Sequence, residues 1–285
     1  MRRQKSFQND LPSLYLVSTP IGNLEEMSPR AIDTLKNVSV IAAEDTRVSS
    51  KLLAAFDIHT KLISHHMHNE KESAEGILKL LRSGQHVALI SDAGLPLISD
   101  PGYNLVLTII EAGFNVIPIG IPSAALAALV VSGLSPQPYV FYGFLPTQDK
   151  ALKQELNQLK SYGCTLIFYE APHRVKKTLQ KILAELGDRR AVLAREITKI
   201  HEEILRGTLS ELIEVVDDLK GEMVLVVEGL QTERNPDLDL SEIQAMIQSS
   251  MDAGLSASDA IKAISKQTGI PKNTIYQHFH QKEPS

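Results

Sequence analysis

The feature that most constrains the fold of this chain is an alternation of short apolar runs, rich in β-branched residues, with amphipathic helical patterns. In the first half, the pattern predicts buried strands at residues 14–18, 38–43, 87–91 and 116–119, and helices at 29–36, 49–56, 71–82 and 103–112. Ser28 followed by Pro29 is typical of a helix start, because serine caps the first turn and proline fits the first helical position. Such alternation predicts an α/β domain with a largely parallel sheet.

A second α/β set follows the first. Its predicted strands are residues 139–144, 165–169, 192–195 and 223–228, and its predicted helices are 151–162, 175–186 and 209–219. We expect the helical run 124–132 to link the two sheets.

These patterns predict two α/β domains and a helical tail, since 285 residues exceed one ordinary domain. The N-terminal domain is expected at residues 13–123 and the C-terminal domain at 124–232, with a linker and tail at 233–285. Within the tail, residues 258–268, a Gly-Ile-Pro turn and residues 273–279 resemble a helix-turn-helix.

Charge and composition exclude several classes of protein. The net charge of −5 and an aromatic content of 5% argue against a surface built to coat nucleic acid. Residues 171–206 hold nine Lys/Arg against five acids, which indicates either a local basic patch or solvated helix faces. Cys164 is the single cysteine, so no intrachain disulfide and no thiolate zinc cluster is expected. The chain has no apolar run of membrane-spanning length and no signal peptide, so a cytoplasmic location is expected.

Ligands of parallel sheets bind outside the carboxyl ends of the strands, so the segments that follow the predicted strands are the place to look for a site. Five such segments combine small, acidic or histidine residues with glycine and proline. They are residues 18–24 (STPIGNL), 44–47 (EDTR), 65–70 (HHMHNE), 91–102 (SDAGLPLISDPG) and 118–125 (PIGIPSAA). Each segment has a simpler local explanation as a turn or helix cap. Together they predict one crevice that a single ligand shares.

The chemistry of these segments leaves alternatives open. Glu44 and Asp45 can act as a base or bind a hydroxyl, whereas Asp45 can equally be a helix cap paired with Arg47. The histidine-rich segment indicates proton or metal chemistry, but no complementary Cys/His pair stands elsewhere, so we expect a hydrogen-bonding substrate loop and no metal. The turn at 18–24 has one glycine, which disfavours a dinucleotide oxidoreductase.

Seven strings between residues 14 and 229 resemble, in this order, the tetrapyrrole-methylase-like (class III) methyltransferases. They are LYLVSTPIGNLEEMSPRAIDTL, IAAEDTR, HMHNE, ALISDAGLPLISDPGY, TLIFYEAPHR, LAREITK and GEMVLVVEG. Within that superfamily they look like the branch that methylates small-subunit ribosomal RNA. Two positions depart from the family pattern, because Leu95 stands where threonine is usual and Ile121 where glycine is frequent.

The resemblance implies an α/β fold of the tetrapyrrole methylase type, with S-adenosyl-L-methionine bound in a cleft between two domains. It also implies a homodimer that methylates the 2′-hydroxyl of a cytidine, position 1402, in 16S rRNA of the small ribosomal subunit. The matching positions that would bind the cofactor are Pro20, Ser91, Asp92, Ala93, Ile98, Ser123, Ala124, Tyr169 and Arg195.

A ribose hydroxyl is a weak nucleophile, so methyl transfer to it calls for a base or a strong hydrogen-bond acceptor. The catalytic candidates are Glu44, Asp45, His66, His68 and Glu70. Candidates for binding the RNA substrate are Arg47, Asn69, Arg174 and Lys199.

Two competing hypotheses remain at this point. One is a methyltransferase of the same superfamily that acts on a tetrapyrrole or another small molecule. The other is a nucleic-acid-binding regulator without activity, which the five decorated strand ends disfavour. Residues 241–285 of the tail hold four Lys/Arg against four acids, so the tail is a poor binder of duplex DNA, and either binds RNA by shape or packs in the dimer.

Overall fold

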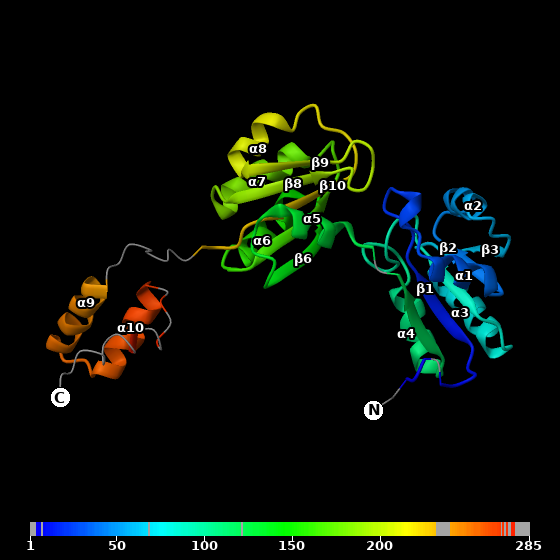
Figure 1. Ribbon diagram of the computed structural model, residues 1–285, viewed down its shortest axis with the longest axis horizontal. Helices are drawn as coiled ribbons and strands as arrows, with labels where there is room; N and C mark the ends of the chain where they lie inside the picture. Colours follow the sequence, from blue (N-terminus) through cyan, green and yellow to red (C-terminus); the bar gives the residue numbers. More distant parts are fainter. Residues whose placement is uncertain are drawn as a thin grey trace. The chain divides into compact units, whose positions relative to one another are not determined.

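Five parallel strands form the first sheet, drawn from blue to cyan-green in Figure 1. The strands are β1 (Ser13–Val17), β2 (Val40–Ala43), β3 (Lys61–Ser64), β4 (Val87–Ile90) and β5 (Asn115–Ile119), in the order β3-β2-β4-β1-β5. All four pairings are parallel, as the alternating pattern predicts. β2 and β4 are buried at every position, which is typical of central strands covered on both faces.

Helices cover both faces of this sheet. α1 (Pro29–Asn37) and α2 (Thr46–Ala55) pack on one face, where Leu35 and Leu53 contact the core around Ile41. α3 (Glu70–Arg82) and α4 (Tyr103–Ala112) pack on the other face. A short 3-10 helix spans Leu24–Glu26, between β1 and α1. Ser28 caps α1 by accepting a hydrogen bond from the Ala31 N–H, as predicted.

The second sheet, green to yellow in Figure 1, contains β6 (Tyr139–Phe144), β7 (Thr165–Glu170), β8 (Arg190–Arg195), β9 (Glu203–Thr208) and β10 (Met223–Val227). Its order is β6-β7-β10-β8-β9. Only β6 and β7 pair in parallel, whereas the other three pairings are antiparallel. The second sheet is therefore mixed, whereas the first is parallel throughout.

Four helices complete this part of the chain. α5 (Ala124–Ser132) packs on one face of the second sheet, against Ile167, Val192 and Val226. α6 (Asp149–Leu159), α7 (Val175–Leu186) and α8 (Leu209–Val215) pack on the opposite face. The helix at 124–132 thus connects the last strand of the first sheet to the first strand of the second, and it also packs in the core of the second sheet.

Two strands and one helix end differ from the sequence prediction. β3 and β9 are edge strands in which apolar and polar residues mix, so neither gives a continuous apolar run. α8 ends at Val215 rather than at residue 219, and its start is fixed by a capping box between Thr208 and Glu211. The other predicted elements are present with ends shifted by a few residues.

The structure is a computed structural model that describes residues 4–6, 8–67, 69–120, 122–231, 240–268, 270, 272, 275 and 276. The chain divides into two compact units. Met1–Lys160 and Cys164–Glu228 form the first, and Ser161–Gly163 and Gly229–Ser285 form the second. Among the described residues, no helix is both long enough and apolar enough to cross a membrane.

The second unit contains α9 (Leu240–Asp252) and α10 (Ala257–Thr268). Ile243, Ile247, Ile261, Ile264 and Ile275 are buried together and form a small core of its own. α10 matches the predicted helix at 258–268, whereas most of the predicted helix at 273–279 lies outside the described residues.

Candidate functional site

The five segments that follow the strands of the first sheet are connected to one another by hydrogen bonds. Thr19 and Gly94 form an isolated β-bridge, with backbone distances of 2.9 and 3.1 Å, which joins residues 18–24 to residues 91–102. The Ser18 hydroxyl donates to the carbonyl of Gly120 (3.0 Å), which brings in the segment at 118–125. The strand ends therefore converge, as the positions of the motifs predict.

The two remaining segments are tied to the same long loop. The Asp45 N–H donates to a carboxylate oxygen of Asp92 (3.2 Å). Glu70 accepts hydrogen bonds from the Gly102 N–H (3.2 Å) and from the Asn104 side chain (3.0 Å). The loop at 91–102 is thus the hub of the carboxyl edge.

This hub has unusual backbone angles. Leu97 and Ser99 have φ of 75° and 71°, in the left-handed region that residues with a side chain rarely adopt, and they stand between Gly94 and Gly102, whose φ values are also positive. The Leu97 side chain packs in the core below α4, which holds the strained turn in place. Strain of this kind is concentrated at ligand-binding loops in proteins.

A cavity of about 660 Å³ lies beside the hub, within the size range of small-molecule sites. Loops of the first sheet contribute Ile21 and the stretches 93–95, 98–100 and 122–124 to its wall. The second sheet contributes the remaining lining residues, which are Phe144, Tyr169, Glu170, Ala171, Pro172, Glu196, Ile197, Lys199, Gly221, Glu222, Met223 and Val224.

The electrostatics of the cavity are acidic. Its lining includes four carboxylates, of Asp100, Glu170, Glu196 and Glu222, against one cation, Lys199. Burial raises the pKa of Asp100, although a hydrogen bond from Ser91 opposes that shift. Burial also raises the pKa of the Tyr169 phenol, to which the Ala125 N–H and the Ser123 hydroxyl donate. Lys199 pairs with Glu196 and Glu222, and Arg174 pairs with Glu170, so Asp100 is the lining carboxylate that has no cation partner among the described residues. A negative charge at that position suits a cationic ligand.

Five of the nine positions predicted for the cofactor line this cavity: Ala93, Ile98, Ser123, Ala124 and Tyr169. Ser91 is buried at the end of β4. Its hydroxyl oxygen lies 3.4 Å from the Gly94 carbonyl oxygen, so it contacts the loop at 91–102 from within the core. Asp92 holds the Asp45 backbone, and Pro20 lies beside the Thr19–Gly94 bridge. Arg195 is outside the lining, with its guanidinium donating to Glu203 (2.5 Å) and to the Lys220 carbonyl (3.2 Å).

The structure separates the catalytic candidates by what their side chains already bind. Asp45 caps α2 and pairs with Arg47, and the Arg47 hydrogen bonds lower the pKa of Asp45 to about 2. The Glu70 carboxylate accepts hydrogen bonds from Gly102 and Asn104 at the start of α4. His66 is held through its backbone N–H by Asn69 (2.8 Å), and His68 lies outside the described residues.

Glu44 is different from these residues. No hydrogen bond or ion pair engages its carboxylate among the residues that the structure describes, and it follows β2 next to the end of β4. Burial raises the pKa of Glu44, and the neighbouring negative charges of Asp100, Asp92 and Asp45 raise it further. None of Glu44, Asp45, His66 and Glu70 is in the cavity wall.

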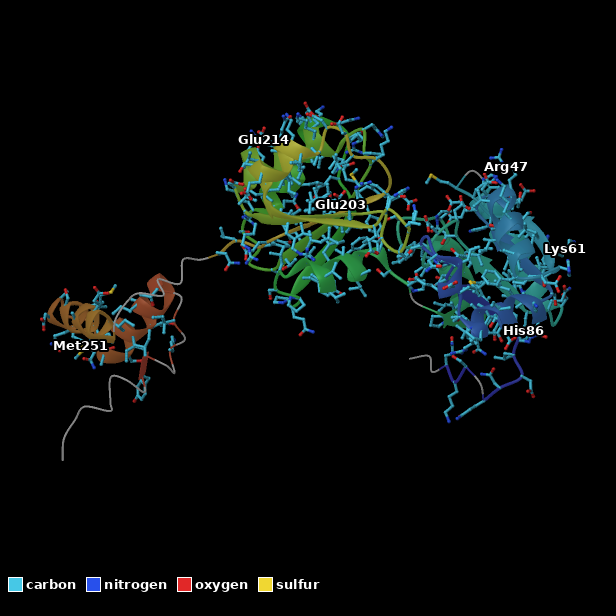
Figure 2. The ribbon with its side chains drawn as sticks, turned by 45° about the horizontal axis from the view of Figure 1, so that its top comes forward. Arg47, Lys61, His86, Glu203, Glu214 and Met251 are labelled. Carbon is cyan, nitrogen blue, oxygen red and sulfur yellow. The ribbon has the colours of Figure 1, made fainter. Side chains whose placement is uncertain are left out.

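The predicted RNA-binding cations are mostly engaged within the fold. Arg174 lies 3.5 Å from the buried carboxylate of Glu170 and donates to the Leu145 carbonyl (3.2 Å). Lys199 lies between Glu196 (3.0 Å) and Glu222 (2.9 Å). Arg47, although paired with Asp45, is 88% exposed, and Figure 2 shows it at the surface of α2.

The same holds for the whole basic segment at 171–206. Seven of its nine Lys/Arg form ion pairs, and the other two donate to backbone carbonyls. The paired residues are Arg174, Lys176, Lys177, Lys181, Arg190, Arg195 and Lys199. Arg189 is buried and donates to three carbonyls, and Arg206 donates to the Val131 carbonyl. The segment is therefore a set of solvated, neutralised helix and strand faces rather than a free basic patch.

Sequence reasoning missed several lining residues. Asp100 lies within the quoted hub segment but was not singled out, although an acidic residue in a loop punctuated by glycine and proline is a signal that the sequence does carry. Phe144, Glu170 and Glu222 come from the second sheet, and nothing local in the sequence shows that they approach the first.

Comparison with known proteins places these features in a family. The family model described as "Tetrapyrrole (Corrin/Porphyrin) Methylases" matches residues 13–213. A curated relative from Bacillus subtilis (strain 168), named "Ribosomal RNA small subunit methyltransferase I", is 46% identical over 99% of this chain and 100% of its own length. A protein of the same name from Synechocystis sp. is 44% identical over 93% of this chain and 96% of its length.

Two solved structures share the fold at much lower sequence identity. A cobalt precorrin-4 methyltransferase matches 76% of this chain and 94% of its own, with a TM-score of 0.60 at 16% identity. Diphthine synthase matches 76% of this chain and 89% of its own, with a TM-score of 0.58 at 12% identity. By fold, by family model and by identity over nearly its full length, the chain belongs to the tetrapyrrole methylase family and, within it, to the ribosomal RNA small subunit methyltransferase I group.

Proposed function

We propose that this chain transfers a methyl group from S-adenosyl-L-methionine to the 2′-hydroxyl of a cytidine, position 1402, in 16S rRNA. The observation that carries the proposal is the cavity at the carboxyl edge of the first sheet: three of the five converging segments line it, and the other two are hydrogen-bonded to the loop at 91–102. The names of the relatives, which match over nearly the whole chain, support rRNA as the substrate class.

The residues of the cavity fit the proposed methyl donor. S-adenosyl-L-methionine supplies a methyl group that is already activated by a positive sulfur. Asp100, the lining carboxylate that no described cation pairs with, would favour such a cation. Tyr169 offers aromatic surface, and Ser123 opens α5 with N–H groups that suit a carboxylate.

The task of the protein in this reaction is to orient two reactants and to accept one proton. Glu44 is the best candidate for accepting the proton of the ribose hydroxyl, because its carboxylate is unengaged and its pKa is raised. Asp45 would be a poorer base, since Arg47 stabilises its charged form. In this scheme Asp45 and Arg47 fix the start of α2, and thereby the backbone beside Glu44.

The proposal is tested by incubating the purified chain with radiolabelled donor and, separately, with 30S subunits, free 16S rRNA and uroporphyrinogen. We expect label in the RNA of particles that were not methylated beforehand, and mass spectrometry of nuclease digests should place it on the ribose of cytidine 1402. Label on uroporphyrinogen alone would instead favour the second candidate, a small-molecule methylase.

A homodimer in the cytoplasm is part of the proposal. Tyr103, Leu107 and Ile110 lie at helical spacing on α4 and are 65%, 38% and 41% exposed, which supports a second copy as their cover. Sedimentation equilibrium should give twice the mass of the chain, and the variant Leu107→Glu should give the mass of a monomer.

A further inference from the structure

An irregularity in the edge strand of the second sheet places one aromatic side chain at the cavity. Between Phe141 and Gly143 the pairing of β6 with β7 shifts by one residue, so that Tyr142 is the extra residue of a bulge. Gly143 has φ of 81°, a backbone angle that glycine adopts without steric cost. A Cβ at this position would meet the Ser99 hydroxyl oxygen at 3.5 Å, so the bulge also lies against the hub loop.

The bulge changes the face on which Phe144 lies. In a regular strand, residues three apart point to opposite faces, which would send Phe144 away from Phe141. Because of the extra residue, Phe141 pairs with Ile167 and Phe144 pairs with Tyr169, and these two partners share one face of β7. Both phenylalanine rings then pack edge-on against Tyr169, with centroid distances of 5.0 and 5.6 Å.

This arrangement leaves an aromatic ring uncovered. Phe144 is 53% exposed although it packs on Tyr169 and lines the cavity. Burying a phenylalanine is favourable, and facing the opposite side of the sheet, against α6 to α8, would have buried it. The bulge thus turns an apolar ring toward the open part of a ligand site, which is a recurring use of bulges next to active sites.

Resting on the proposed function, we propose that Phe144 is the platform on which the base of the target nucleotide stacks. Single-stranded RNA is recognised largely by stacking of unpaired bases on aromatic rings, and enzymes that modify a nucleotide often extrude it from its helix. The cations of residues 171–206 nearest the cavity, Arg174, Arg195 and Lys199, are paired with carboxylates of the fold, which favours contacts other than phosphate pairing next to the cavity. An exposed aromatic ring beside an acidic cavity meets that need.

The matched variants are Phe144→Leu, which keeps apolar volume but removes the aromatic face, and Phe144→Trp, which keeps the face. Tyr139→Leu is the control, because Tyr139 is an aromatic residue at the other end of β6, 42% exposed and outside the cavity wall. Donor affinity is measured by calorimetry, and RNA affinity by filter binding with unmethylated 30S subunits. Circular dichroism establishes that each variant is folded.

For Phe144→Leu we expect RNA binding to weaken about tenfold to a hundredfold, as removal of one base–aromatic stack does. Donor affinity should stay within about twofold, and Phe144→Trp and Tyr139→Leu should bind RNA like the wild type. A second readout uses 30S particles reconstituted with 16S rRNA that lacks the base at the target ribose. If the ring stacks on that base, the abasic particle should bind the wild type and Phe144→Leu equally weakly.

Two results would overturn the inference while leaving the proposed function intact. If Phe144→Leu loses donor affinity as strongly as RNA affinity, the Phe144 ring lies against the donor and not against the target base. If Phe144→Leu methylates and binds 30S subunits like the wild type, the Phe144 ring contacts neither the donor nor the RNA. A wild-type chain that binds donor but labels no RNA would instead overturn the proposed function, and this inference with it.

Discussion

Gly22 lies directly against the side chain of Lys199. A Cβ on Gly22 would stand 2.5 Å from the Lys199 Cγ and 2.9 Å from the Thr198 hydroxyl oxygen. Gly22 belongs to the turn after β1, and Lys199 follows β8 of the second sheet, so this contact joins loops of the two sheets beside the cavity that Ile21 and Lys199 line. The Lys199 ammonium is fixed in turn by Glu196 and Glu222.

The first prediction follows from this contact. Gly22→Ala should destabilise the fold by about 1–3 kcal/mol, the usual cost of overpacking, and should weaken donor binding because the cavity wall must shift. Thermal unfolding and calorimetric titration of the donor measure the two effects. Gly76→Ala is the matched control, since nothing lies within 4 Å of a Cβ there and α3 should gain up to about 1 kcal/mol of helix stability. Equal effects of the two variants would contradict the proposed role of the contact.

A second prediction concerns the base. Glu44→Gln should lower the single-turnover rate of methyl transfer by about a hundredfold or more, because a positioned base contributes at least that factor, while donor affinity is retained. The carboxylate must be charged to accept a proton, and its pKa is raised, so the wild-type rate should fall with decreasing pH at a higher pH than the ordinary glutamate value of 4.5 implies. Burial of Glu44 contributes most to this raised pKa, and the negative charges of Asp100, Asp92 and Asp45 add to it.

The matched variant for the base is Asp45→Asn. This change keeps a side-chain oxygen that can cap α2, and it removes a carboxylate whose charge Arg47 already neutralises. We expect a small change in rate and an acid limb displaced to lower pH, because one neighbouring negative charge is lost. If Asp45→Asn is the slower of the two enzymes, Glu44 is not the base.

A third prediction distinguishes two arginines of the sequence analysis. Arg174→Met leaves the carboxylate of Glu170, whose side chain is 1% exposed, without its cation, and should cost about 3 kcal/mol of stability. Adding Glu170→Gln should restore much of this loss, as judged by urea unfolding. Arg47→Ala should leave stability nearly unchanged, because an exposed ion pair contributes about 1 kcal/mol or less.

The same pair of variants separates fold from RNA binding. Arg47→Ala should weaken the binding of 30S subunits. The slope of log K against log salt concentration should become shallower by about 1, the change expected for the loss of one phosphate contact. Arg174→Met, measured where it is folded, should keep the wild-type salt dependence. The opposite pattern would show that Arg174 contacts phosphate despite its partners in the fold.

A fourth prediction concerns the tail. The helices α9 and α10 have their own isoleucine core, and none of the described cavity-lining residues comes from them. A chain that ends at residue 231 should therefore bind the donor with wild-type affinity but methylate 30S subunits more slowly. Initial rates at saturating donor measure this difference, and full activity of the shortened chain would rule out a part for the tail in substrate recognition.

The local elements and the carboxyl-edge site follow from the sequence because they depend on short-range physics. Apolar runs and helical periodicity located most strands and helices. Ser28 before Pro29 predicted the cap of α1, and a cap at Asp45 was one of the two alternatives that the sequence left open. Parallel strands all end at one edge, so segments that are distant in sequence, such as those around Glu44 and Asp92, could be expected to meet. The motif strings alone also predicted the family.

Only the tertiary structure decided which of these residues are still available for a ligand. Asp45, Glu70 and Arg174 carry the right chemistry, but their partners come from hydrogen bonds and ion pairs that sequence spacing does not specify. The edge strands β3 and β9, the bulge that turns Phe144 toward the cavity, and the contact of Gly22 with Lys199 all depend on which chain segments become neighbours in space. The sequence specifies the type of each side chain. The burial of a side chain and its ion-pair partners, which determine its charge and its accessibility to a ligand, are fixed only when the two sheets pack.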